Sequence, residues 1–299
     1  MGGTTLRFCF PDWESRHGDQ DALAQAWLAS QEFAARGPDG LATECVLCGT
    51  QARLKLHGDP ASPDFREGLV CTGCGLNTRL RASLKLLREQ LARWQPAPAP
   101  LPDLLARLGL RPRLPRVYVT EQATATFVWM QRHLQAELHG GEFEPDWRRR
   151  RGLTHALRRM GGRGRVVFRD LTALDFADAS LDGVASFDVL EHVPDYQAAI
   201  GEMYRVLRPG GACVATFPFT DQPTTLVRAR LAADGGIEHL EPPEYHGDPI
   251  SGGILCYYHF GWDVLDRFRE AGFSQACMAM PYSLEHGLPY GMWTLVAIR

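Results

Sequence analysis

Hydrophobic residues recur near helical spacing in two stretches of the amino-terminal part of the chain. In the first stretch they are Leu23, Trp27, Phe33 and Ala34, with Asp19 as a cap and Gly37-Pro38 as a stop signal. In the second stretch Leu80, Leu84, Leu87, Leu91 and Trp94 share one helical face. These patterns predict helices over residues 19–36 and 77–94.

From about residue 112 the pattern changes to short apolar runs that alternate with stretches of helical spacing. The apolar runs predict strands at 117–120, 165–169, 182–187, 213–217, 275–280 and 293–298, with a weaker strand at 139–144. Helices are predicted at 123–138, 198–207 and 262–271, and the stretch 220–258 is irregular. This alternation predicts an α/β fold with an open, mostly parallel sheet and helices on both faces.

A proline-rich stretch, Gln95-Pro-Ala-Pro-Ala-Pro-Leu-Pro102, separates the two patterns. Alternating prolines favour an extended, semi-rigid spacer. We therefore expect a helical segment at 1–40, a cysteine-containing module with its helix at 41–94, a linker at 95–115 and a sheet domain at 116–299.

Four of the eight cysteines form two matched pairs, Cys45-Val-Leu-Cys48 and Cys71-Thr-Gly-Cys74. Two such pairs let four thiolates converge on one Zn²⁺, and a glycine follows each pair. We predict a closed structural zinc site with Cys45, Cys48, Cys71 and Cys74 as ligands. A redox pair or an iron–sulfur cluster is the alternative. The other cysteines (Cys9, Cys213, Cys256 and Cys277) are scattered singletons.

Composition excludes several classes of protein. The formal net charge of −3 argues against a general polyanion binder with a basic surface. No apolar run approaches the roughly 18 residues of a membrane span, and the first residues lack the pattern of a secretory signal. We expect a cytoplasmic protein without a membrane partner.

Acidic residues stand where the predicted strands end. In open α/β sheets the ligand binds beyond the carboxyl ends of the strands. The residues at these positions are Glu121, Glu142, Asp170 and Asp188, followed by Glu191 and His192. They are the candidate ligand-binding residues.

One continuous pattern runs from Asp170, through Asp188-Val-Leu-Glu-His192, to Arg205-Val-Leu-Arg-Pro-Gly-Gly211. It resembles the class I S-adenosylmethionine-dependent methyltransferases of the type 11 group. The resemblance implies a Rossmann-like seven-stranded sheet with a small amino-terminal helical and zinc-ribbon domain. It also implies that Asp170, with Leu171 beside it, contacts the adenine of S-adenosylmethionine, and that Asp188 lies in the cofactor site. The cysteine pairs followed by Leu76-Asn-Thr-Arg-Leu-Arg81 are similar to a bacterial subset with a zinc module.

The chain departs from this family at its glycine-rich loop after the first strand. Glu121, Ala123 and Ala125 occupy the glycine positions. We predict that Glu121 pairs with the α-amino group of the cofactor and that Ala123 keeps the backbone close to it. Glu142, with Glu144 as the fallback, is the candidate for the ribose hydroxyls, because one carboxylate can accept two hydrogen bonds. The alternatives are a solvated surface glutamate and a fold that no longer binds the cofactor.

Methyl transfer needs positioning and a base for the proton of the nucleophile. His192 is one candidate base, and its alternative role is to order the loop around it. The region 238–263 concentrates polar and aromatic residues. His246 or His259 is therefore a second candidate base, and Tyr245 or Tyr257 a candidate wall of the site. An ordered loop that caps the sheet is the alternative.

Three functions remain open at this point. The first is methyl transfer to a small-molecule or glycan acceptor. The second is an RNA or protein methyltransferase that docks through the zinc module and an arginine cluster; the cluster comprises arginines 148–151, 158, 159, 163 and 165. The third is a non-catalytic, zinc-stabilised binding protein on the same fold. The net charge favours the first function, so we expect a small partner and no nucleic acid.

Overall fold

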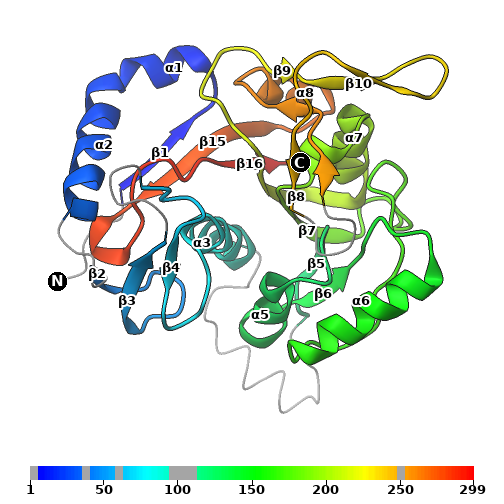
Figure 1. Cartoon of the computed structure of the whole chain (residues 1–299), viewed down its shortest axis with the longest axis horizontal. Helices are drawn as coiled ribbons and strands as arrows, with labels where there is room; N and C mark the ends of the chain where they lie inside the picture. The colour runs from blue at the N-terminus through cyan, green and yellow to red at the C-terminus, as the bar shows by residue number, and fades with distance from the viewer. Residues whose placement is uncertain (1–5, 36–40, 58–62, 94–112, 248–252) are drawn as a thin grey trace.

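The computed structural model describes residues 6–35, 41–57, 63–93, 113–247 and 253–299 (Figure 1). Its centre is a seven-stranded sheet in the order β1-β15-β16-β8-β7-β5-β6. The strands are β1 (Leu6–Phe10), β5 (Arg116–Val119), β6 (Glu137–Gly140), β7 (Leu181–Phe187), β8 (Leu207–Thr216), β15 (Gln275–Tyr282) and β16 (Thr294–Ile298). The predicted α/β class and a sheet of seven strands are confirmed, although not every predicted strand belongs to it. The predicted linker at 95–115 lies outside the described residues up to residue 112.

The sheet is parallel in one half and antiparallel in the other. β6, β5, β7 and β8 pair in parallel, whereas β16, β15 and β1 join the β8 edge with antiparallel pairings. The prediction of a mostly parallel sheet is therefore wrong for the second half. The reason is that β15 and β16 pair with each other in antiparallel register, with no crossover helix between them.

The prediction of a strand at 165–169 is wrong. This segment makes one isolated parallel bridge, between Glu142 and Phe168, beside the β6 edge of the sheet. The side chain of Gln122 accepts from the Val167 N–H at 3.2 Å and donates to the Arg165 carbonyl at 2.9 Å, so a side chain takes the place of a neighbouring strand. The seventh strand is instead β1, whose pairing with residues 278–282 no local pattern indicates.

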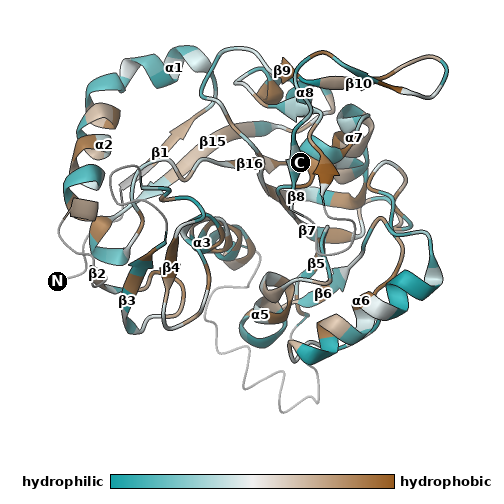
Figure 2. Ribbon diagram, viewed as in Figure 1, coloured by the Kyte–Doolittle hydropathy of each residue, from teal (hydrophilic) through white to brown (hydrophobic). Residues whose placement is uncertain are grey.

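Strand residues alternate between two hydrophobic cores, one on each face of the sheet. Val117 and Val119 belong to one core and Tyr118 to the other. The helices of the first core are α3 (Thr78–Ala92), α5 (Ala125–His133) and α6 (Trp147–Arg159), and those of the second are α7 (Tyr196–Val206) and α8 (Val264–Glu270). The sheet is therefore covered on both faces, as predicted; in Figure 2 the helix α6, which the sequence did not predict, is mostly hydrophilic.

The other predicted elements are confirmed with shifted ends. The helix predicted at 19–36 is α2 (Gln20–Ala35), preceded by the short helix α1 (Trp13–Gly18). The helix predicted at 77–94 is α3, and the one predicted at 123–138 ends early because β6 begins at Glu137. A disulfide joins Cys9 of β1 to Cys277 of β15, with Cα atoms 6.1 Å apart, so these two cysteines are not singletons.

Two smaller regions stand beside the sheet. The module at 41–93 consists of β2 (Leu41–Glu44), β3 (Gln51–Leu56) and β4 (Leu69–Cys71), followed by α3, whose amino terminus is capped by Asn77. Between β8 and α8 lies an insertion of short antiparallel pairs: β9 (Leu226–Val227), β10 (Ala229–Leu231), β11 (Ile237–His239), β12 (Tyr245–His246), β13 (Ile254–Leu255) and β14 (Tyr258–His259). Among the described residues, no helix has the length and hydropathy of a membrane span.

Candidate functional site

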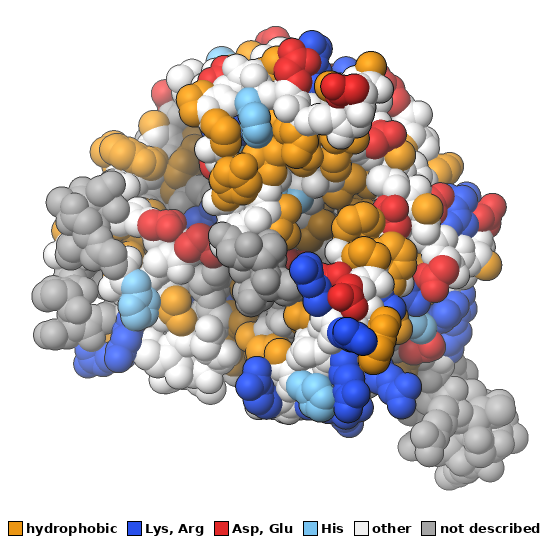
Figure 3. All heavy atoms as spheres, turned by 45° about the vertical axis from the view of Figure 1, so that its right-hand side comes forward, with side chains coloured by type: hydrophobic (Ala, Val, Ile, Leu, Met, Phe, Trp, Pro, Cys, Tyr) orange, Lys and Arg blue, Asp and Glu red, His pale blue; other side chains and the backbone are white. Residues whose placement is uncertain are grey.

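A cavity of about 1340 Å³ lies beyond the carboxyl ends of the four parallel strands. Residues that follow each of them line it: Thr120 after β5, Glu142 after β6, Asp188 after β7 and Phe217 after β8. Figure 3 shows this face of the molecule hollowed, with hydrophobic side chains around the hollow. Pockets that bind drug-sized ligands usually measure roughly 300–1,000 Å³, so this cavity has room for more than one small molecule.

Most of the residues predicted to bind the cofactor line this cavity. They are Glu121, Glu142, Asp170, Leu171 and Asp188. Ala123 does not line it; the backbone N–H of Ala123 instead donates to the Glu142 carboxylate at 2.6 Å. The structure thus brings the strand-end carboxylates together and gives Ala123 a supporting position.

The carboxylate of Glu142 is fixed by the loop that follows β5. Its Oε1 accepts from the backbone N–H of Gln122 at 2.8 Å and from that of Ala123. A Cβ at Gly140 would lie 2.5 Å from the Gln122 Cγ, and one at Gly141 would lie 2.7 Å from the Arg169 Cβ. The close approach that glycine permits is therefore required at the end of β6.

Glu121 lies among other carboxylates at the cavity wall. Burial, reinforced by the charge of Glu142, raises the pKa of Glu121 to about 8, although Arg79 acts in the opposite direction. A cationic group bound beside Glu121 would favour its ionised form. This end of the cavity is therefore suited to a ligand with an ammonium or sulfonium group.

Asp170 stands at the start of a tight turn. Its Oδ1 accepts from the backbone N–H of Thr172 at 2.8 Å and from the Thr172 hydroxyl at 2.7 Å. Leu171, next in the chain, is buried against the core on the α7 side. The turn holds both residues at the cavity edge, where the sequence places the adenine contact.

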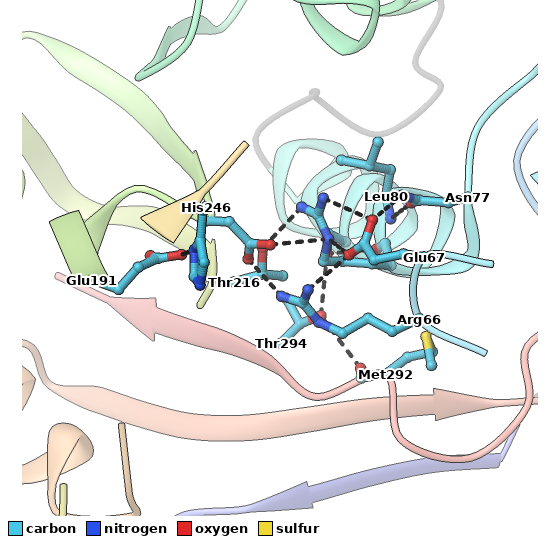
Figure 4. A network of polar contacts seen from close by, with 12 residues as sticks. Arg66, Glu67, Asn77, Leu80, Glu191, Thr216, His246, Met292 and Thr294 are labelled. Carbon is cyan, nitrogen blue, oxygen red and sulfur yellow. Dashed lines mark hydrogen bonds and ion pairs between the residues drawn. The ribbon is translucent and has the colours of Figure 1, made fainter. Parts of the chain in front are cut away.

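Asp188 joins the sheet to the module at 41–93. Its Oδ1 lies 2.6 Å from the Arg66 guanidinium, and its Oδ2 lies 3.3 Å from Nε of Arg79. Burial would raise the pKa of Asp188, but Arg79 and Arg66 outweigh it and lower that pKa below its ordinary value. Both arginines also contact Glu67, and Figure 4 shows this network of ion pairs. Arg66 and Arg79 line the cavity from the module and are not among the site residues predicted from the sequence.

The predicted catalytic residues also meet at the wall of this cavity. His192 belongs to the short helix η1 (Leu190–His192), His246 to β12 and His259 to β14, and all three line the cavity. Nε2 of His246 and Nε2 of His259 lie 3.0 and 3.1 Å from the same Oε1 of Glu244. Tyr245 also lines the cavity, but it is 60% exposed and stands at the mouth. The insertion and η1 thus bring together residues that are far apart in the sequence.

The four predicted zinc ligands converge in the module. The Sγ atoms of Cys45, Cys48, Cys71 and Cys74 all lie within 4.8 Å of one another. Sulfurs at 2.3 Å from a tetrahedral zinc are roughly 3.8 Å apart, and the Cys48 and Cys71 sulfurs are separated by 4.0 Å. The glycines after the pairs, Gly49 and Gly75, have φ of +67° and +73°, which only glycine adopts freely.

A buried cation accompanies the cysteines. Arg81 is fully buried, interacts electrostatically with Cys45, and donates to the Thr78 hydroxyl at 2.8 Å. Its Nε and one terminal nitrogen donate to no described residue. Four thiolates around Zn²⁺ carry a net charge of −2, so a buried cation beside them is electrostatically favourable. The donor set therefore fits zinc.

The predicted arginine cluster lies on and just after α6. Arg149 contacts Glu144 at 3.6 Å and reaches the cavity edge, and Arg150 donates to the Glu144 and Pro145 carbonyls. Arg148, Arg149 and Arg151 are exposed. The cluster is thus mainly an exposed helix face.

Comparison with known proteins finds similarity in one part of the chain. A family model described as "Methyltransferase domain" matches residues 126–215. The chain is 38% identical over 82 residues to a demethylmenaquinone methyltransferase of Thermus thermophilus, which covers 26% of this chain and 35% of the relative. It is 39% identical over 135 residues to 24-methylenesterol C-methyltransferase 2 of Oryza sativa, covering 45% of this chain and 33% of the relative. The chain therefore spans about a third of the length of these relatives.

Solved structures of methyltransferases are also similar to the chain. An S-adenosylmethionine-dependent methyltransferase from Mesorhizobium loti matches with a TM-score of 0.40 and 17% identity over 64% of this chain and 95% of the other. The 1,6-didemethyltoxoflavin-N1-methyltransferase of Burkholderia thailandensis, with 1,6-didemethyltoxoflavin and S-adenosylhomocysteine bound, matches with a TM-score of 0.36 and 20% identity over 66% of this chain and 74% of the other.

Proposed function

We propose that the chain is a class I S-adenosylmethionine-dependent methyltransferase that methylates a small-molecule acceptor. Its residues 126–215 match the methyltransferase model, and its sheet is Rossmann-like. The observation that carries this proposal is the single cavity at the strand ends. Carboxylates that suit a cationic cofactor and histidines both line it. Its volume leaves room for an acceptor beside the cofactor.

The residues at the strand ends would hold S-adenosylmethionine. Glu142 faces the ribose hydroxyls, Asp170 and Leu171 bind the adenine, and Glu121 pairs with the α-amino group. Asp188, held by Arg66 and Arg79, fixes the wall near the methionine part. When bound, the cofactor supplies an electrophilic methyl group whose leaving group is neutral. The chain therefore contributes orientation and the activation of the acceptor.

The acceptor would enter through the apolar mouth of the cavity. Phe143, Leu231, Tyr245 and Ile254 line the cavity and are exposed, Phe143 by 72%. Exposed apolar side chains around a hollow are typical of ligand entrances. We infer an acceptor with an apolar surface, and we assign its activation to the side of the cavity formed by His192, His246 and His259.

The module at 41–93 would bind one structural Zn²⁺ through Cys45, Cys48, Cys71 and Cys74. Four sulfur ligands leave no open position, so this ion would stabilise the module and take no part in methyl transfer. Its effect on the site would be indirect, because the module carries Arg66 and Arg79 into the cavity wall.

Calorimetric titration with S-adenosylhomocysteine tests the cofactor assignment. We expect micromolar-range binding, about −8 kcal/mol, and a large loss of affinity in Asp170→Ala. Absence of binding at high ligand concentration would contradict the proposal. Incubation of cell extract with methyl-labelled S-adenosylmethionine then tests the acceptor class. Label in the small-molecule fraction supports the proposal, and label confined to RNA or protein contradicts it.

A further inference from the structure

Glu191 is a buried residue whose carboxylate oxygens accept no hydrogen bond in the described part of the chain. Its side chain is fully buried, and neither oxygen accepts a hydrogen bond from any residue in the described part of the chain. Burial of an unpaired carboxylate is costly, because the charge loses its hydration. A cation must therefore balance Glu191 when it is ionised.

Two histidines direct a ring nitrogen at this carboxylate. Nε2 of His192 lies 3.8 Å from Oε1 of Glu191, and Nδ1 of His246 lies 3.5 Å from the same oxygen. These separations are too long for hydrogen bonds. Figure 4 shows Glu191 and His246 side by side at one end of the polar network.

The other nitrogen of each ring already has an acceptor. Nδ1 of His192 lies 2.8 Å from the Leu255 carbonyl, and Nε2 of His246 lies 3.0 Å from the Glu244 carboxylate. In the neutral ring that donates through these nitrogens, the nitrogen that faces Glu191 keeps a lone pair. Metal-binding histidines are oriented in this way, by a carbonyl or carboxylate behind the ring.

We propose that Glu191, His192 and His246 bind a divalent transition-metal ion of the Mn²⁺ to Zn²⁺ series. The three ligand atoms lie within 4.8 Å of one another. Ligands at about 2.0–2.1 Å from a tetrahedral ion are roughly 3.3 Å apart, so small shifts of the side chains complete the geometry. Imidazole nitrogens with one carboxylate oxygen suit this series of metals.

The ion would keep a coordination position open towards the cavity. His192 and His246 line the cavity, whereas Glu191 lies behind them. Three protein ligands with an open fourth position are typical of metal sites that bind an exchangeable ligand. An oxygen donor such as a hydroxyl group fits this position. That this oxygen belongs to the methyl acceptor rests on the proposed function; the metal site itself does not.

Metal counting on the full chain tests the site. After loading with Zn²⁺ and desalting, the wild-type protein is expected to hold two equivalents, one in each cluster. Glu191→Gln and His246→Ala are expected to hold one equivalent, and both are checked for native circular dichroism. His239→Ala, in the same insertion but outside the cluster, is the matched control and should keep two. One equivalent in the wild type, or two in Glu191→Gln, would overturn the proposal.

Cobalt spectroscopy identifies the ligands independently of activity. Co²⁺ in the cysteine cluster gives sulfur-to-metal charge-transfer bands, whereas Co²⁺ bound by nitrogen and oxygen gives only weaker ligand-field bands. We expect both kinds of band in the wild type, and only the sulfur-to-metal charge-transfer bands in Glu191→Gln. Acetohydroxamate should shift the weaker bands alone. If only the charge-transfer bands are present in the wild type, a protonated His246 balances Glu191 and no metal does.

Discussion

Two regions supply charges of opposite sign to the same cavity, and they are built differently. The module at 41–93 presents the cations Arg66 and Arg79, and its fold is organised around four cysteines. The strand ends present the anions Glu121, Glu142 and Asp188, on a sheet whose two faces are packed against helices. Asp188 links the two regions through both arginines. The module therefore lines the cavity although it lies outside residues 126–215, which match the methyltransferase model.

The largest expected effect comes from removing the metal-binding capacity of the module. Cys71→Ala should lose its structural zinc and destabilise the protein by roughly 3 kcal/mol or more, because structural zinc contributes directly to folding. Thermal unfolding and zinc content measure this. Cys213→Ala, a buried cysteine of the sheet, is the control and should keep its zinc. If Cys71→Ala keeps the stability and the zinc content of the wild type, the fold of the module does not depend on a metal bound by its cysteines.

The strand-end side is tested at Glu142. Glu142→Gln keeps an oxygen for the Gln122 and Ala123 N–H groups but replaces the other with a donor. We expect the affinity for S-adenosylhomocysteine to fall by roughly 10–100-fold, about 1.4–2.8 kcal/mol, with little change in zinc content. Glu137→Gln, at the exposed opposite end of β6, is the matched control. If Glu144→Gln lowers this affinity and Glu142→Gln does not, then Glu144 binds the ribose.

The link between the regions is measured by a double-mutant cycle of Arg79→Ala and Asp188→Asn. The two side chains are largely buried, so we expect a coupling free energy of about 1–2 kcal/mol in chemical unfolding. The same cycle with Arg66 should give a smaller value, because Arg66 is more exposed to solvent. A coupling near zero for both arginines would mean that the module merely lies beside the sheet.

The smallest expected effect is a pH dependence. Because the pKa of Glu121 is raised to about 8 in the free protein, a cationic ligand that prefers the carboxylate binds fully above that pH and more weakly as the pH falls below it. We expect the affinity for S-adenosylhomocysteine to fall about threefold to tenfold between about pH 9 and pH 7. Glu121→Gln should remove this dependence of the affinity on pH. If the dependence is unchanged in Glu121→Gln, another titrating group causes it.

The parts of the molecule that the sequence predicts are those encoded locally. The cysteine pairs need only a short spacing, and Glu121, Glu142, Asp170 and Asp188 are found because each follows an apolar run. The prediction of a strand at 165–169 is wrong because the backbone of this segment bonds to the side chain of Gln122, 45 residues away in the sequence. Arg66 and Arg79 were missed because an arginine shows no local signal of a carboxylate partner more than a hundred residues further along. Glu191 and His246 meet only through the folded insertion.

The strand β1 also has a consequence for the order of synthesis. Its partner β15 lies close to the other end of the chain, and 268 residues separate the cysteines that join them. During translation the edge of β1 that pairs with β15 therefore stays unpaired until nearly all of the sheet has been synthesised. Exposed strand edges template aggregation, and long-range pairings form slowly. Nascent chains that stall before β15 would carry an open edge that recruits other chains.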